Sequence, residues 1–116
     1  MKTSRFQARR RGFTLLEILI VVAVLGILVG MAFPNFLKSR NNAQKQICIE
    51  NLSQIESAKQ IWGVENGKKD GDPPTDGDLF GSSRYMKKKP MCPGGGTYDL
   101  TSVGANATCT IAGHSL

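Results

Sequence analysis

The N-terminal end of the chain lacks acidic residues and is rich in basic ones.

 The first twelve residues contain no acid but five basic side chains, and residues 13–33 carry one charge, that of Glu17. The formal net charge of +6 and the pI near 9.5 are typical of nucleic-acid-binding proteins. Without the first twelve residues, however, 10 basic side chains face 9 acidic ones, a net charge of +1. The uneven charge therefore argues against direct nucleic-acid binding.

Catalytic residues are also scarce. His114 is the only histidine, and no serine, cysteine or aspartate lies near it in a known catalytic motif. The run Gly94–Gly96 lacks the following Lys-Ser/Thr of a phosphate-binding loop. We therefore predict that the chain is not an enzyme and has no cofactor.

An apolar run follows the basic leader. Residues 13–33 would span about 31 Å as a helix, which matches a hydrocarbon core of about 30 Å. The arginines at 9–11 predict that the N-terminus stays in the cytoplasm. Three kinds of signal fit this pattern: a secretory signal cut after Ala32, a twin-arginine signal at Arg10-Arg11, or a leader cut before a retained helix.

Glu17 favours the retained helix. A carboxylate inside a spanning segment costs about 2.5–3.5 kcal/mol on insertion scales, so it needs a compensating cation. Cleavage after Gly12 would create one, the α-amino group of Phe13, about one helical turn from Glu17. In a packed assembly the amine of one subunit could instead pair with Glu17 of a neighbour and fix the axial register.

The segment Gly12-Phe13-Thr14-Leu15-Leu16-Glu17 closely resembles the prepilin signal of type IV pilins and type II secretion pseudopilins. The resemblance implies cleavage after Gly12 by a prepilin peptidase, N-methylation of Phe13 and a role for Glu17 in assembly. It also implies an inner-membrane subunit, with its N-terminus in the cytoplasm, that joins identical or homologous pilins in a periplasmic or extracellular filament. An assembly platform and an ATPase would be further partners. The alternative is a secreted soluble binding protein released by cleavage after Ala32.

The implied fold is α+β and pilin-like, with one long N-terminal helix and a small C-terminal β-hairpin. We expect a cleaved leader at 1–12, a transmembrane assembly helix at 13–33 and an amphipathic continuation at 34–66. Residues 67–116 would form the head from a loop, a short helix and the hairpin.

Three residues predict how the apolar helix packs and bends. Gly26 and Gly30 form a Gly-x-x-x-Gly pair, which lets helix backbones approach closely, although glycine is also common in membrane helices. Pro34 has no N–H, so the carbonyl of Gly30 loses its helical partner. The resemblance likewise implies a bend at Pro34.

The second half of the helix has one apolar stripe. Its members recur at intervals of three and four residues: Cys48, Leu52, Ile55, Ala58 and Trp62. Ile47 and Ile61 are expected to widen the stripe, and Lys59 to lie off it. Asn66-Gly67 predicts the end of the helix.

The loop after the helix is rich in aspartate. The spacing of its carboxylates suggests weak candidates for calcium ligands, but Pro73-Pro74 interrupts any EF-hand pattern and turn or cap contacts explain them equally. Some type II secretion pseudopilins bind calcium in a C-terminal loop, and their motif is not found here. The four residues are Asp70, Asp72, Asp76 and Asp78.

The remaining segment predicts a short helix at 78–88 and strands at 97–100 and 108–111. Cys92 and Cys109 flank the first strand, and we expect a disulfide between them, worth about 3 kcal/mol on the loop-entropy model. Cys48 would then be either a small buried apolar residue or a partner for a C-terminal cysteine. His114, alone in its sequence neighbourhood, predicts no metal site.

Overall fold

The computed structural model describes residues 9–116. Most of the leader, residues 1–8, lies outside the described residues, so the expected leader is described only from Arg9 onward. The chain divides after Phe36 into two compact units, and the long helix α1, Leu15–Glu65, contributes residues to both. The predicted long N-terminal helix is thus confirmed, and Pro34 lies inside it without ending it.

The first unit is an uncovered apolar helix. Between Leu15 and Phe36 every side chain is exposed, and the large apolar ones are at least half exposed. A Cβ atom added at Gly26 or Gly30 would meet nothing within 4 Å, so this surface is open at both glycines. By length and hydropathy the helix could cross a membrane.

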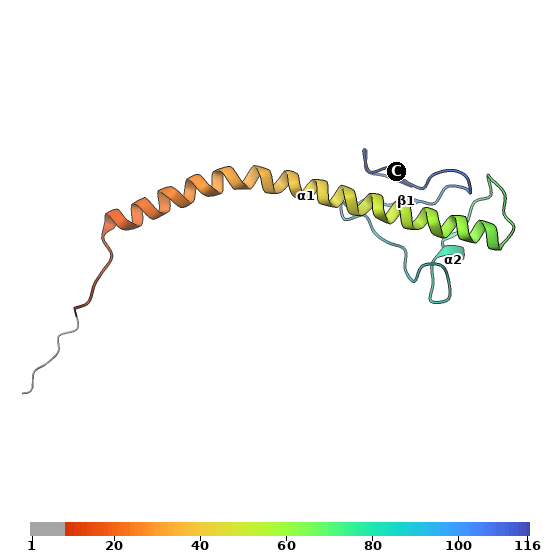
Figure 1. Ribbon diagram of the computed structural model, residues 1–116, viewed down its shortest axis with the longest axis horizontal. Coiled ribbons are helices and arrows are strands. Elements are labelled where there is room, and N and C mark those ends of the chain that lie inside the picture. The colour runs from red at the N-terminus through yellow and green to blue at the C-terminus, as the bar shows by residue number, and fades with distance from the viewer. Residues whose placement is uncertain (1–8) are drawn as a thin grey trace, which may run out of the picture. The chain divides into compact units, whose positions relative to one another are not determined.

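The second unit, Leu37–Leu116, has a small core built on α1. Figure 1 shows β1 and the C-terminal segment beside the yellow-green part of α1. All five predicted stripe residues are buried, and all of them except Ala58 belong to one core cluster with Leu79, Tyr98, Leu100 and Ala107. Loops and one hairpin of the same chain therefore cover the apolar stripe of α1.

Two predictions about the edges of the stripe were wrong. Ile47 and Ile61 are 47% and 50% exposed, whereas Lys59 is fully buried. Position 59 continues the alternating spacing of four and three residues that runs through Leu52 and Ile55, so helix geometry places it on the buried face despite its charge.

The helix ends where the sequence predicts. The N–H of Lys68 donates to the carbonyl of Gly63 at 2.8 Å, and Gly67 has a φ of +60°. A glycine in the left-handed region closes the last turn without steric cost.

Three short elements complete the second unit: α2, Asp76–Leu79; β1, Tyr98–Asp99; and β2, Thr108–Cys109. β1 and β2 pair antiparallel, with Tyr98 opposite Cys109 and Asp99 opposite Thr108. The predicted hairpin is confirmed with shorter strands, and the predicted helix at 78–88 is replaced by the single turn of α2.

Candidate functional sites

The N-terminus of α1 carries the residues of the predicted processing signal. Gly12 and Phe13 precede the helix, and Phe13 is 86% exposed. The Thr14 N–H donates to Glu17 Oε2 at 2.8 Å, and the Glu17 N–H donates to the Thr14 hydroxyl at 3.2 Å. These reciprocal bonds form a capping box, so Glu17 satisfies a backbone donor at the start of its own helix.

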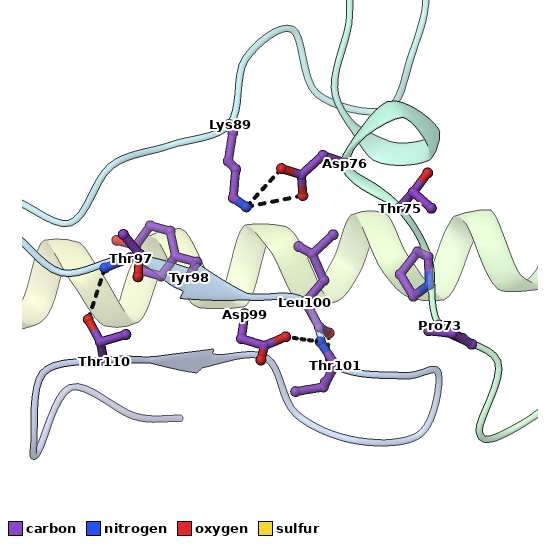
Figure 2. A pocket seen from close by; sticks show the side chains of 11 residues that line it. Pro73, Thr75, Asp76, Lys89, Thr97, Tyr98, Asp99, Leu100, Thr101 and Thr110 are labelled. Atoms are coloured by element: carbon purple, nitrogen blue, oxygen red, sulfur yellow. Dashed lines mark hydrogen bonds and ion pairs between the residues drawn. The ribbon is translucent and has the colours of Figure 1, made fainter.

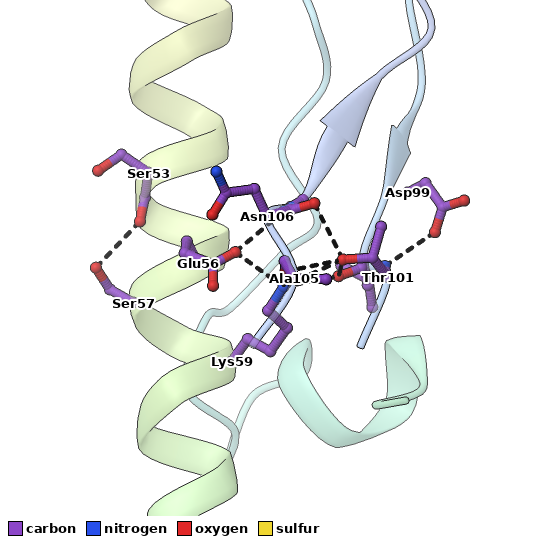
Figure 3. Close-up of polar contacts among 10 residues, drawn as sticks. Ser53, Glu56, Ser57, Lys59, Asp99, Thr101, Ala105 and Asn106 are labelled. Atoms are coloured by element: carbon purple, nitrogen blue, oxygen red, sulfur yellow. Dashed lines mark hydrogen bonds and ion pairs between the residues drawn. The ribbon is translucent and has the colours of Figure 1, made fainter. Parts of the chain in front are cut away.

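A second polar arrangement is buried beneath the hairpin loop. The Lys59 ammonium lies 2.8 Å from Glu56 Oε2 and donates to the carbonyls of Leu100, at 3.0 Å, and Ala105. Glu56 also accepts the N–H of Ala107 at 3.1 Å. Figure 3 shows both side chains reaching from α1 to the loop between the strands. The Glu56–Lys59 pair thus supplies hydrogen-bond partners to backbone groups of the loop, which lie outside the two short strands.

Thr101 completes this arrangement. Its hydroxyl accepts from Lys59 at 3.3 Å, and its N–H donates to Asp99 Oδ1 at 3.0 Å. Its φ of +55° is unusual for a β-branched residue. The buried ammonium therefore holds together a turn that the local sequence does not favour.

The aspartates of the predicted calcium loop are engaged separately. Asp72 accepts the N–H of Lys69, and Asp78 accepts both the N–H and the hydroxyl of Thr75. Those bonds from Thr75 lower the pKa of Asp78. Asp76 pairs with Lys89 at 3.0 Å. Turn and cap contacts thus account for Asp72 and Asp78, and an ion pair accounts for Asp76. No group of three acids gathers as a cation site among residues 9–116.

The Asp76–Lys89 pair lies at an open groove of about 630 Å³. Figure 2 shows the groove between the loop at Pro73 and the strand β1. Tyr98 and Leu100 are among the residues that line the groove. Because the carboxylate and the ammonium face each other, the groove offers neither charge alone to a ligand.

The cysteines and the histidine form one cluster. Cys48 comes from α1, Cys92 from the loop before β1, Cys109 from β2 and His114 from the C-terminal segment. Their sulfur atoms and a ring nitrogen of His114 all lie within 4.8 Å of one another. The expected Cys92–Cys109 disulfide is not formed in this structure, in which all three cysteines are free.

The surroundings of the thiols differ. Burial raises the pKa of Cys48. Burial also acts to raise the pKa of Cys92, but hydrogen bonds from Cys48, from His114 and from the N–H groups of Gly94 and Gly96 lower it overall. Sequence reasoning missed this cluster because its members lie far apart in the chain; the glycine-rich turn after Cys92 was the available signal.

Comparison with known proteins gives matches along most of the chain. Residues 7–33 match the family described as the prokaryotic N-terminal methylation motif. The type II secretion system core protein G of Dickeya chrysanthemi is 30% identical over 118 residues, covering 90% of this chain and 76% of that protein. The type IV wide pilus major component PilA4 of Thermus thermophilus is 30% identical over 105 residues, covering 90% and 74%.

A third relative matches a shorter part of the chain. The type IV major pilin protein PilA of Myxococcus xanthus is 40% identical over 68 residues, which cover 59% of this chain and 31% of that protein. No solved structure matches the chain.

Proposed function

This chain belongs to the family of type IV pilins and type II secretion pseudopilins, and from that premise we propose that it is a structural subunit of a pilus or pseudopilus. A prepilin peptidase removes residues 1–12 and methylates the new amino group of Phe13. The processed chain stays in the inner membrane, with its N-terminus toward the cytoplasm, until the assembly platform and its ATPase transfer it to the filament.

The uncovered helix of the first unit carries this proposal. Among the described residues, 9–116, its large apolar side chains are at least half exposed, and burying apolar surface is worth about 25 cal/mol per Å². Lipid covers this surface before assembly, and the helices of neighbouring subunits cover it afterwards. Gly26 and Gly30, open in the single chain, let those helices approach closely.

Glu17 sets the register of the packed helices in this proposal. The carboxylate is 2.8 Å from the N–H of Thr14, the residue that follows Phe13. After cleavage the Phe13 amine is positively charged and can reach a Glu17 carboxylate, in its own chain or a neighbour's. An unpaired charge in the apolar filament core is costly, so assembly proceeds only in registers that pair the two groups.

The first test is the mature N-terminus. We expect mass spectrometry of the chain from membranes or filaments to find N-methylated Phe13 as its first residue. A chain that begins at Phe33, after ordinary cleavage at Ala32, would instead indicate a secreted protein and contradict the proposal.

The second test separates the charge of Glu17 from its capping bonds. Glu17→Gln keeps a side chain suited to a capping box but removes the charge, whereas Thr14→Val removes the capping hydroxyl and keeps the charge. We expect Glu17→Gln to lose nearly all filaments while still inserting in the membrane, and Thr14→Val to assemble. Glu50→Gln, an exposed site on the same helix, is the matched control. Normal filaments from Glu17→Gln would exclude the pairing.

A further inference from the structure

The cluster of Cys48, Cys92, Cys109 and His114 uses every cysteine and the only histidine of the chain. Four separate segments bring these groups within 4.8 Å of one another. Cys48 is fully buried and Cys92 is 4% exposed, so the cluster lies against the core of the second unit. We propose that the four residues bind one Zn²⁺ in a tetrahedral site with three thiolates and one imidazole.

The distances suit such a site. Zinc takes sulfur ligands at about 2.3 Å and nitrogen at about 2.0–2.1 Å, so a tetrahedron separates sulfur from nitrogen by roughly 3.6 Å. Cys92 Sγ and His114 Nδ1 are 3.6 Å apart. Two sulfurs in the same tetrahedron lie roughly 3.8 Å apart, within the span of the cluster. The ion therefore fits with small shifts of the side chains.

The ligand types select the metal. Thiolate and imidazole favour zinc among the common divalent ions, whereas Ca²⁺ and Mg²⁺ take oxygen ligands. Binding involves no change of oxidation state: the thiols release their protons to solvent, and the neutral imidazole binds through Nδ1. Four protein ligands leave no open coordination position, so the site is structural.

The glycine-rich turn after Cys92 lies close against the sulfur atoms of Cys92 and Cys109. A Cβ atom at Gly96 would lie 2.8 Å from Cys109 Sγ, and one at Gly94 would lie 2.8 Å from Ile111 Cδ1. Gly95 has a φ of +89°. Only a residue without a Cβ atom lets the backbone at position 96 lie this close to the Cys109 sulfur.

A disulfide between Cys92 and Cys109 is the competing arrangement. It would explain two of the four residues, and it would leave the gathering of the Cys48 sulfur and the His114 ring nitrogen beside them unexplained. Zinc uses all four groups and connects α1 to the C-terminal segment.

The test uses the full chain, extracted from membranes in detergent without added reductant. We expect close to one zinc per chain by elemental analysis, and three cysteines that react with iodoacetamide only after denaturation with a chelator. Chelation should lower the midpoint of thermal unfolding. Cobalt(II) added to the stripped protein should give the visible bands and thiolate charge-transfer absorption of a tetrahedral centre.

Variants at His114 provide the control. His114→Ala should lose most of the metal at a fixed chelator concentration, whereas His114→Cys, which restores a ligand, should retain it; Ser115→Ala should behave as the unaltered chain. Metal-free protein with a Cys92–Cys109 disulfide would overturn the proposal, as would a tetrahedral cobalt spectrum unchanged by His114→Ala. The unaltered chain is measured in every case, so a variant that fails to fold does not decide the result.

Discussion

The two parts of α1 meet different surroundings although they form one helix. From Leu15 to Phe36 the apolar residues lie on all sides and are exposed, whereas from Leu37 the apolar residues of the core lie on one face and are covered. The first part depends on lipid or other subunits for its burial, and the second part depends on its own chain. One helix can therefore serve assembly and folding through separate residues.

We expect the second unit to be destabilised most by loss of the buried Glu56–Lys59 ion pair. Lys59→Ala takes the ammonium away from Glu56 and from the carbonyls of Leu100 and Ala105, and we expect it to lower the free energy of unfolding by about 3–5 kcal/mol. Fluorescence of Trp62, the only tryptophan and a core residue, reports this unfolding in detergent. Lys45→Ala, at an exposed position, should change it by less than about 0.5 kcal/mol. Equal effects would contradict the role of the pair.

The same substitution in both parts of the helix tests the comparison directly. Leu52 is fully buried and Leu25 is 54% exposed. Leu52→Ala should cost about 2–5 kcal/mol in the unfolding of the second unit, because it removes buried methyl groups and leaves a cavity. Leu25→Ala should leave that unfolding unchanged and reduce filament yield. A large effect of Leu25→Ala on Trp62 fluorescence unfolding would mean that the two parts are not separate.

The smallest expected effect is at Asp78. Its pKa is lowered by the bonds from Thr75, so its contribution to stability is present above the pKa of the unfolded chain, near 3.9, and is lost as the pH falls through the lower folded value. Asp78→Asn should cost about 1 kcal/mol or less at pH 7 and little at pH 3. Unfolding curves at both pH values check this, and a cost that grows toward low pH would contradict it.

Periodicity and one motif predicted the helix, its end, its buried stripe and the hairpin. These features are local, because spacing along the chain sets them. Lys59 was missed because its charge outweighed its position. Glu56 is a local partner, but the two carbonyls that Lys59 also bonds belong to residues 41 and 46 positions away, and no side-chain pattern reveals them. The Cys/His cluster was missed for a related reason: its members are gathered by the fold, and the hairpin that gathers them has strands of only two residues.

Those short strands affect how copies of the chain meet. A long open strand edge is a template for pairing with another chain, and such pairing leads to aggregation. Here β1 and β2 have two residues each, and the loop carbonyls of Leu100 and Ala105 are already bonded to Lys59. In a filament, where many heads are crowded together, little backbone is left free for edge-to-edge association. The heads can then be neighbours at high density without joining their sheets.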